Sequence, residues 1–386
     1  MVPSALGSSH ETKTPTLLNR DQTEEWKGWM QVTFLLYHYF EAKEVYNAIR
    51  IFIAAYVWMT GFGNFSYYYI RADFSAGRFA QMMWRLNFFV FFACAALRND
   101  YVLYYICPMH TLFTIAIYGV LAVQQAANRS SVGVAAKVVA CLVAVVVLWD
   151  APGVFAAVFG PFTWLVGFVD PRTPDIDPLH EWKFRTGLDR YVWVYGMACA
   201  FCHPAAERAL DRLDALRPPA RLAARLGVLG ASVGAGWVWY TRVYSLDKFA
   251  YNTLHPYTSW IPLTLWVVFR NLFPAARLVY IELFAYLGKI TLETYICQFH
   301  IWLHAGVPNG QPGKLLVLVP GYPLLNFLAT TGLYVFVSKR MFEVTNTLKN
   351  AHVPLKDNAL LASNAAAGAA VLLAFYAVAF LAQAVY

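Results

Sequence analysis

The sequence predicts an all-α polytopic membrane protein with about ten transmembrane helices. Hydrophobic residues make up 59% of its 386 residues, and charged residues make up 13%, whereas a soluble domain usually carries about a quarter. Long apolar runs recur from residue 51 to the C-terminus. Runs such as VGVAAKVVACLVAVVVLW do not alternate between polar and apolar residues, as the strands of a membrane barrel would. Helices are therefore the expected spanning elements.

The apolar runs define the expected spans in chain order. An early stretch, 26–42, is short and flanked by charge, which suits an interfacial or re-entrant helix. Near 150–188, proline and glycine interrupt an apolar stretch, and irregular backbone at membrane depth must be buried in protein or line a cavity. That segment is expected to be re-entrant. The spans are expected at 48–68, 79–97, 101–124, 133–149, 189–203, 222–241, 255–272, 277–304, 314–337 and 359–384.

Charge and cysteine usage narrow the class further. Residues 1–20 form a polar tail without the apolar core of a signal peptide, and 21–386 are expected to form a single membrane-embedded domain. Basic residues gather in connections such as 204–225 and 338–358, which the positive-inside rule places in the cytosol. These connections account for the net charge of +8. The charge therefore does not predict a nucleic-acid partner, and membrane lipid is the expected environment. The six scattered cysteines predict free thiols, and no motif predicts a metal site.

Polar residues in the first apolar stretch provide the first candidate site. His38 and Glu41 are three residues apart, so they share one face of a helix. A histidine oriented by a carboxylate can act as a base near neutral pH. His38, with Glu41 or Glu44, is therefore the first candidate for a catalytic base. Arg50 lies in the first long helix, where a charge usually pairs or lines a pathway. Polar residues at the membrane surface are the alternative interpretation.

The segment RADFSAGRFAQMMWRLNF provides candidate phosphate ligands. Arg78 and Arg85 are seven residues apart and share a helix face, and Asn87 follows within the same apolar run. Arginines near a cytosolic surface suit phosphate groups, which a guanidinium binds through two parallel hydrogen bonds. The alternative is that Arg85 pairs with a structural carboxylate such as Glu44 or Asp73.

The segment GKITLETYICQFHIWLH predicts a polar stripe on an apolar helix. Its members, Lys289, Glu293, Cys297, His300 and His304, follow steps of four, four, three and four. Such a stripe must face the protein interior or water. We therefore expect Glu293 and His300 to face one interior cavity, with Lys289 within pairing distance of Glu293.

Two further polar positions lie near the ends of expected spans. His110 follows Pro108 near the start of its span, and it joins His38 and His300 as a candidate base. Asp189 and Arg190 end the broken segment, and they are expected to form an ion pair at the lumenal mouth of a cavity.

Several of these motifs resemble the ten-transmembrane O-acetyltransferase family. This family includes fungal capsule O-acetylation proteins, plant reduced-wall-acetylation proteins and animal sialate O-acetyltransferase. The resemblance runs from about residue 17 to beyond residue 340. It is carried by QTEEWKGWMQVTFLLYHYFEAKEVYNAIRIFIAAYVWMTGFGNFSYYY, DFSAGRFAQMMWRLNF, YYICPMHTLFT, HEWKFRTGLDRYVWVYGM and LGKITLETYICQFHIWL.

The resemblance implies a Golgi membrane enzyme. Such an enzyme passes acetyl from cytosolic acetyl-coenzyme A, its co-substrate, to hydroxyls of a lumenal glycan, and it uses no metal. The acceptor would be a cell-wall or capsular polysaccharide or a sialic acid. The phosphates of coenzyme A would meet Arg50, Arg78, Arg85 and Asn87. Animal members also carry a lumenal esterase-like domain before the membrane part, where this chain has about 20 residues. Three alternatives follow: the sequence is a truncated part of a longer protein, acetyl passes through a separate esterase-like partner, or the membrane part acts alone.

A carrier is the alternative class of protein. A transporter of acetyl-coenzyme A or acetyl would use buried histidine, glutamate and arginine equally well. Internal symmetry would favour a transporter, and no repeat is visible in the sequence. A purely structural subunit would leave the polar stripe unexplained.

Overall fold

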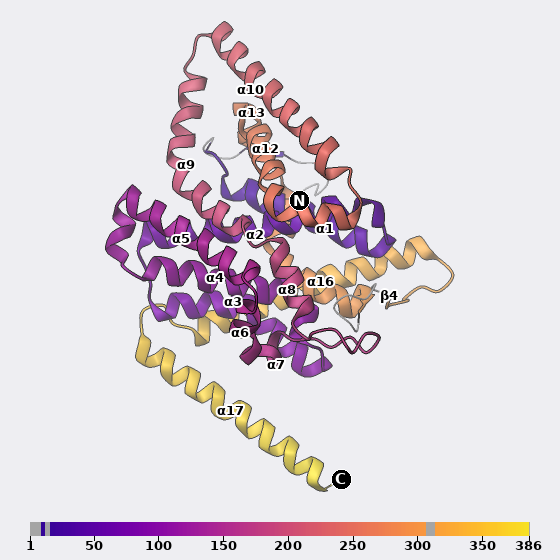
Figure 1. Ribbon diagram of the computed structural model, residues 1–386. Helices are drawn as coiled ribbons and strands as arrows, with labels where there is room; N and C mark the ends of the chain where they lie inside the picture. Colours follow the sequence, from indigo (N-terminus) through magenta and orange to yellow (C-terminus); the bar gives the residue numbers. More distant parts are fainter. Residues whose placement is uncertain (1–8, 12–15, 306–312, 386) are drawn as a thin grey trace.

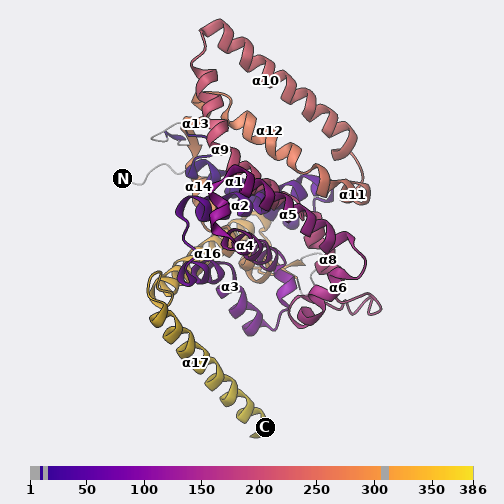
Figure 2. The same cartoon turned by 60° about the vertical axis from the view of Figure 1, so that its left-hand side comes forward.

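The chain folds almost entirely into helices, which confirms the all-α class. The computed structural model describes residues 9–11, 16–305 and 313–385. Figures 1 and 2 show a central body of helices, with α9 and α10 rising from one side and α17 leaving the opposite side. The strands within these residues are β1 (Ser9–Glu11), paired antiparallel with β2 (Val279–Ile281), and β3 (Leu303–His304), paired antiparallel with β4 (Gly313–Lys314).

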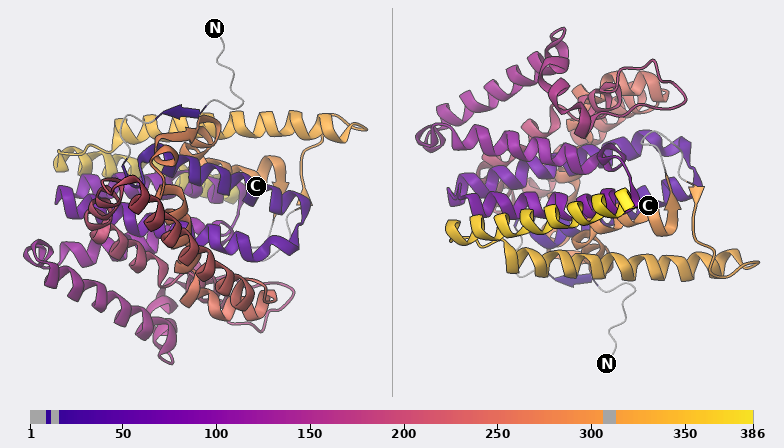
Figure 3. Two further views of the ribbon diagram at one scale, coloured as in Figure 1. Left: turned by 90° about the horizontal axis from the view of Figure 1, so that it is seen from above. Right: turned by 90° about the horizontal axis from the view of Figure 1, so that it is seen from below.

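The first half of the chain supplies the long helices of the body. Asn19, Ser75 and Ser130 cap three of these helices, because each side chain accepts a hydrogen bond from a backbone N–H of the first turn. Figure 3 shows the indigo and purple helices running roughly parallel through the body. They are α1 (Arg20–Phe40), α2 (Tyr46–Arg71), α3 (Ala76–Leu97), α4 (Ile106–Ala122) and α5 (Ser131–Asp150).

The second half begins with the broken segment and ends with two long helices. The broken segment forms short turns, α6 (Val154–Phe159), η4 (Gly160–Phe162) and α7 (Thr163–Val166). The helices that follow are α8 (His180–Leu188), α9 (Val192–Asp214), α10 (Pro218–Trp239), α11 (Lys248–Thr258), α12 (Trp260–Asn271), α13 (Pro274–Leu278), α14 (Glu282–Lys289), α15 (Thr291–Cys297), the π-helical turn η6 (Gln298–Trp302), α16 (Pro323–His352) and α17 (Asn358–Val385).

Several helices are long and apolar enough to cross a membrane, as expected of a membrane protein. Within the described residues there are five such segments, and they match five of the ten expected spans. They are Lys43–Arg71, Ala76–Leu97, Ser131–Asp150, Pro218–Tyr244 and Asn358–Leu381.

Three expected spans differ from the helices observed. The span 255–272 divides into α11 and α12, because Pro262 lacks the N–H that would continue the hydrogen-bond ladder. The span 277–304 divides into α13, β2, α14, α15, η6 and β3. The span 314–337 becomes helical only at Pro323, and α16 then continues to His352. Proline fits the first turn of a helix, where its missing N–H would have no partner.

The early stretch 26–42 forms most of a longer helix that packs on the core. It belongs to α1, a helix of 21 residues. Trp26, Met30 and Phe34 on this helix are buried in the main core. The helix therefore lies inside the body and does not form a surface helix.

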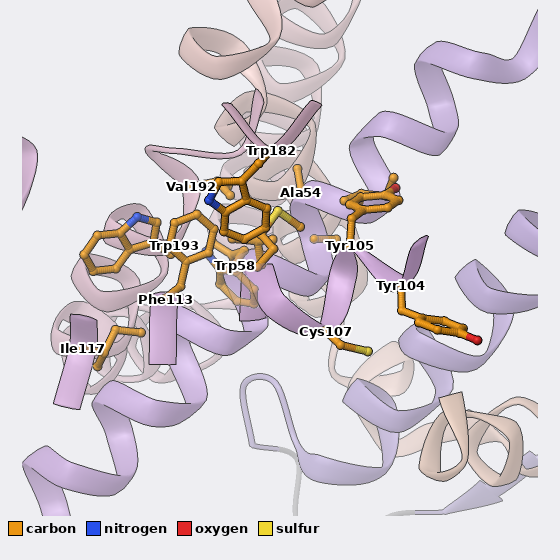
Figure 4. Close-up of a cluster of buried hydrophobic side chains, with 14 of the residues drawn as sticks. Ala54, Trp58, Tyr104, Tyr105, Cys107, Phe113, Ile117, Trp182, Val192 and Trp193 are labelled. Atoms are coloured by element: carbon orange, nitrogen blue, oxygen red, sulfur yellow. The ribbon is translucent and has the colours of Figure 1, made fainter. Parts of the chain in front are cut away.

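Close backbone contacts hold the body together. A Cβ atom on Gly28 of α1 would lie 1.8 Å from the carbonyl oxygen of Phe284 in α14, and one on Gly288 would lie 1.9 Å from that of Glu24. Gly61 in α2 and Gly196 in α9 make a similar contact. Figure 4 shows aromatic side chains from α2, α4, α8 and α9, among them Trp58, Phe113, Trp182 and Trp193, gathered in the main core.

Candidate functional site

A cavity of about 290 Å³ lies between α1, α2, α3, α4 and α15. Most of its wall is apolar, as in most small-molecule sites, and a few polar groups project from different helices. Those polar groups are Lys27, Gln31, Tyr56, Thr60, Arg85, His110, Thr291 and Tyr295. The cavity thus brings together His110, one of the three candidate histidines, and Arg85, the candidate arginine inside the apolar run of α3.

Thr60 is the hydrogen-bond partner of His110 in the cavity wall. Thr60 donates its hydroxyl hydrogen to the carbonyl oxygen of Tyr56, at 3.2 Å. The Thr60 oxygen lies 2.6 Å from Nδ1 of His110. With the Thr60 hydroxyl hydrogen directed to the Tyr56 carbonyl, the Thr60 oxygen accepts from His110, and in this arrangement Nδ1 carries the imidazole proton. The lone pair of Nε2 is therefore left as the acceptor of His110.

Arg85 reaches the cavity from α3 while forming an ion pair behind it. Its guanidinium makes two hydrogen bonds to the Glu293 carboxylate, one of them 3.0 Å between Nη2 and Oε2. The Glu293 side chain is 0% exposed, whereas that of Arg85 is 28% exposed. Arg85 therefore compensates a buried carboxylate and keeps part of its charge accessible.

The expected pairing of Lys289 with Glu293 was wrong. The helix is interrupted at Ile290, between α14 and α15, so the stripe from Lys289 to His304 is not continuous. Lys289 is exposed, and Glu293 pairs with Arg85. The alternative interpretation of Arg85, a structural ion pair, thus holds in part, although its partner is neither Glu44 nor Asp73.

Three cations gather where α3 packs against the last turns of α16. Trp84 on α3 donates a hydrogen bond to the carbonyl oxygen of Thr345 in α16, at 3.1 Å. Gln81 on α3 donates to the carbonyl oxygen of Val353, which directly follows α16, at 2.8 Å. Burial lowers the pKa of the Lys349 ammonium, and the positive charges of Arg85 and Arg78 lower it further. These charges therefore act on one another, as they would in a site awaiting an anion.

Asp73 lies at the turn before α3 and has local partners. It accepts hydrogen bonds from the Ser75 backbone, at 3.1 Å, and from the Tyr67 hydroxyl, at 2.9 Å. Hydrogen bonds from Ser75, and then from Tyr67, hold the pKa of Asp73 below its ordinary value. The Arg78 guanidinium stacks on the Tyr67 ring, 4.0 Å from its centroid. Asp73 thus shapes the turn that presents Arg78.

A second polar network is buried away from the cavity wall. Arg50 donates to Asp189 at 2.7 Å, and His255 lies 3.3 Å from the other oxygen of the same carboxylate. His255 also bonds to the hydroxyl of Tyr251, at 2.9 Å. The expected ion pair between Asp189 and Arg190 was wrong, because Arg190 pairs with Asp150, at 3.1 Å.

The two other candidate histidines do not line this cavity. His38 ends α1 among aromatic rings, and its Nδ1 is buried without a hydrogen-bond partner in the described chain. Glu41 terminates α1 in a left-handed conformation, and both Glu41 and Glu44 are exposed. No bond joins either carboxylate to His38 among the described contacts. His300 lies in η6 and bonds to the hydroxyl of Tyr104, so the expected shared cavity of His300 and Glu293 is not observed.

Asn87 forms a structural link between α3 and α4. Its amide nitrogen donates to Thr111 at 2.9 Å and to the carbonyl oxygen of Met83 at 3.1 Å. Its oxygen accepts a hydrogen bond from Tyr101. These contacts occupy the side chain, and Asn87 is absent from the polar groups of the cavity wall.

Comparison with known proteins places the chain in a family. A protein-family model described as "10 TM Acyl Transferase domain found in Cas1p" matches residues 2–365 of the chain. The chain belongs to this family. A curated relative, the N-acetylneuraminate (7)9-O-acetyltransferase of Danio rerio, is 33% identical over 368 residues. That match covers 92% of this chain and 45% of the relative, so the chain spans less than half the length of that protein. No solved structure matches the chain.

Several polar residues of this acyltransferase-family domain were missed by sequence reasoning. Lys27 and Gln31 are four residues apart on α1, a spacing that places them on one helix face and could have marked them. Thr60 bonds to a histidine 50 positions away, and no local pattern signals that contact. Lys349 belongs to the basic connection 338–358, which was used only to assign orientation, although its charge interacts with the two arginines of α3.

Proposed function

We propose that this membrane domain is an O-acetyltransferase that takes acetyl from acetyl-coenzyme A within the cavity. The observation that supports the proposal is His110, which lines the cavity and whose Nδ1 bonds to Thr60, an arrangement that leaves Nε2 available as an acceptor when Nδ1 carries the proton. A histidine in this state is a general base. The family description, an acyltransferase domain, supports the same chemistry.

The residues of the cavity suit direct transfer to a hydroxyl. The acceptor oxygen attacks the acetyl carbonyl carbon, and its proton passes to Nε2 of His110. The carbonyl electron pair moves onto oxygen and forms a tetrahedral oxyanion. When the carbonyl re-forms, the carbon–sulfur bond breaks, and the coenzyme A thiolate takes the proton from His110. The products are an acetyl ester and the coenzyme A thiol.

The cations at the packing of α3 on α16 suit the phosphates of coenzyme A. Arg78, Arg85 and Lys349 lie there with two carboxylates, Glu293 paired with Arg85 and Asp73 close to Arg78, so one positive charge is left over. Phosphate oxygens accept charge-assisted hydrogen bonds from such groups. Arg50 is less suited to this role because the buried Asp189 already neutralises it.

We infer a glycan hydroxyl as the acceptor, reached directly or through an esterase-like partner. The relative from Danio rerio is named for acetylation of N-acetylneuraminate, which supports a sialic acid or another sugar of an extracellular or lumenal glycan. A Golgi membrane fits such an acceptor, because glycans are elaborated on its lumenal side.

The test supplies the purified protein with acetyl-coenzyme A labelled in its acetyl group and with a panel of sialylated and neutral oligosaccharides. Labelled ester on a sugar is expected for the wild type, with a fall of at least 100-fold in His110→Ala, because general-base catalysis typically contributes about 10²–10⁴-fold. His180→Ala, at an exposed position on α8, is the matched control and should retain activity. Full activity in His110→Ala would remove His110 as the base.

A further inference from the structure

Two donors in the cavity wall have no acceptor. Gln31 is 5% exposed, and its Nε2 has no hydrogen-bond partner in the described chain. Tyr295 is 3% exposed, and its hydroxyl hydrogen likewise has no acceptor there. Both side chains line the cavity. A buried donor left unpaired costs roughly 1–3 kcal/mol, so two of them beside one cavity require an explanation.

The other polar groups of the wall are already engaged. Tyr56 donates to the carbonyl oxygen of Lys27 at 2.5 Å, and the Lys27 ammonium pairs with Glu24 at 2.6 Å. Thr60 forms a hydrogen bond with His110, and Arg85 forms an ion pair with Glu293. Gln31 and Tyr295 therefore differ from these neighbours because each is a neutral, buried donor without an acceptor in the described chain.

The two donors come from helices that lie side by side. Gln31 lies on α1, and Tyr295 lies on α15. The Phe34 ring, one helical turn after Gln31, contacts the Tyr295 ring at a centroid distance of 6.2 Å. The terminal torsion of a glutamine is broad and two-fold, so a half-turn can direct the amide N–H groups of Gln31 toward the cavity. Both donors then lie in the wall of the cavity that a ligand would occupy.

We propose that Gln31 and Tyr295 form the oxyanion hole of this acyltransferase. The inference rests on the proposed function, since it assigns the donors that stabilise the tetrahedral oxyanion formed when the acceptor attacks the acetyl carbonyl. In that step Gln31 Nε2–H and Tyr295 O–H donate to the negatively charged oxygen, while His110 holds the proton taken from the acceptor. Neither donor transfers its own proton. A cavity that excludes water makes such donors more effective.

The first measurement is the rate of acetyl transfer. Gln31→Met and Tyr295→Phe each remove a donor while keeping most of the side-chain volume. Each should lower kcat by on the order of 100-fold with little change in KM, because removal of one oxyanion donor typically costs about 10²–10³-fold in kcat. Gln298→Met is the control, since Gln298 is another buried amide without partners in the described chain and does not line the cavity. Thermal melting of each variant checks the fold.

The second measurement does not need catalysis. Acetonyl-dethia-coenzyme A keeps the carbonyl oxygen and cannot transfer acetyl, whereas S-ethyl-coenzyme A lacks that oxygen. The wild type should prefer the carbonyl analogue about five-fold, the value of one net hydrogen bond of about 1 kcal/mol. The preference should disappear in Gln31→Met/Tyr295→Phe.

The outcomes separate the two proposals. If the wild type shows no transfer but prefers the carbonyl analogue, and the double variant loses that preference, the proposed function fails and the carbonyl contact stands. If the variants keep the preference for the carbonyl analogue, or keep kcat within two-fold of an active wild type, the oxyanion hole is overturned. Equal loss of affinity for both analogues also overturns it, because Gln31 and Tyr295 would then serve general binding or packing.

Discussion

Arg85 illustrates how one side chain can serve structure and ligand together. Its ion pair with Glu293 stabilises the contact between α3 and α15, and its exposed part lies in the cavity wall. Sequence reasoning treated these roles as alternatives, because a helix pattern shows which residues share a face and not which residue lies opposite.

Arg85→Ala should therefore have two separable effects. Removing the guanidinium leaves the buried Glu293 carboxylate without its ion-pair partner, which should lower the free energy of unfolding by about 3 kcal/mol. It should also weaken binding of S-ethyl-coenzyme A by about 10–100-fold, since a charge-assisted hydrogen bond contributes roughly 1.5–3 kcal/mol. Arg85→Ala/Glu293→Gln should recover stability but not affinity. Normal affinity in the single variant, with lower stability, would leave Arg85 a purely structural role.

Thr60 is predicted to position His110 without touching the substrate. Thr60→Val keeps the side-chain shape and removes the oxygen that accepts from Nδ1. The imidazole can then adopt the other tautomer, so kcat should fall about ten-fold, the equivalent of one hydrogen bond of about 1.4 kcal/mol, while KM changes little. Thr60→Ser should restore the rate. Equal rates for the valine and serine variants would show that the tautomer is not held by this contact.

The lowered pKa of Lys349 predicts that binding of coenzyme A depends on pH. In the free protein, burial and the two arginines hold its pKa below the ordinary value. An anionic ligand favours the ammonium and raises that pKa. Binding should therefore take up a proton at alkaline pH, and affinity for S-ethyl-coenzyme A should fall as pH rises through the lowered pKa. In Lys349→Arg the charge persists, and the dependence should vanish. Titration calorimetry in buffers of different ionisation enthalpy measures the proton uptake, and equal uptake in Lys349→Arg would contradict this assignment.

Between helices, the glycine contacts set how closely α1 and α14 can approach. The Cβ of an alanine at 288 would lie 1.9 Å from the carbonyl oxygen of Glu24, which is backbone and cannot rotate away. Gly288→Ala should therefore destabilise the protein by about 2 kcal/mol or more, because overpacking typically costs about 1–3 kcal/mol. Gly119→Ala, where a Cβ would have no neighbour within 4 Å, is the control. Equal melting temperatures would show that α1 and α14 do not pack through these glycines.

Composition and periodicity predicted most of the helices, but they did not predict where segments that contain polar residues break into shorter elements. Long apolar runs such as 79–97 and 133–149 became single helices, because hydrophobicity alone decides them. The segment 277–304 fragmented because its breaks depend on contacts that lie far away in sequence, such as the pairing of β2 with β1. His110 was among the candidates because histidine is rare in apolar runs. Gln31 and Tyr295 were not, because only the fold shows that their donors lack acceptors.

For the molecule as a whole, the question is whether the cavity performs chemistry or passes its ligand across the membrane. A cavity with fixed cations and a histidine suits both, but a carrier has no need of a histidine that is positioned as a base by a bond to Thr60. Acetyl and coenzyme A separate in an enzyme and stay together in a carrier of acetyl-coenzyme A, so their fates distinguish the two.

The decisive measurement follows two labels across a sealed vesicle. The purified protein is reconstituted in liposomes that enclose sialylated and neutral oligosaccharides. Acetyl-coenzyme A labelled separately in its acetyl group and its adenine is supplied outside. We predict that acetyl label appears as ester on an enclosed sugar, that adenine label stays outside as the coenzyme A thiol, and that both changes stop in His110→Ala. Entry of both labels together as intact acetyl-coenzyme A, at a rate unchanged in His110→Ala, would contradict the enzyme and establish a carrier.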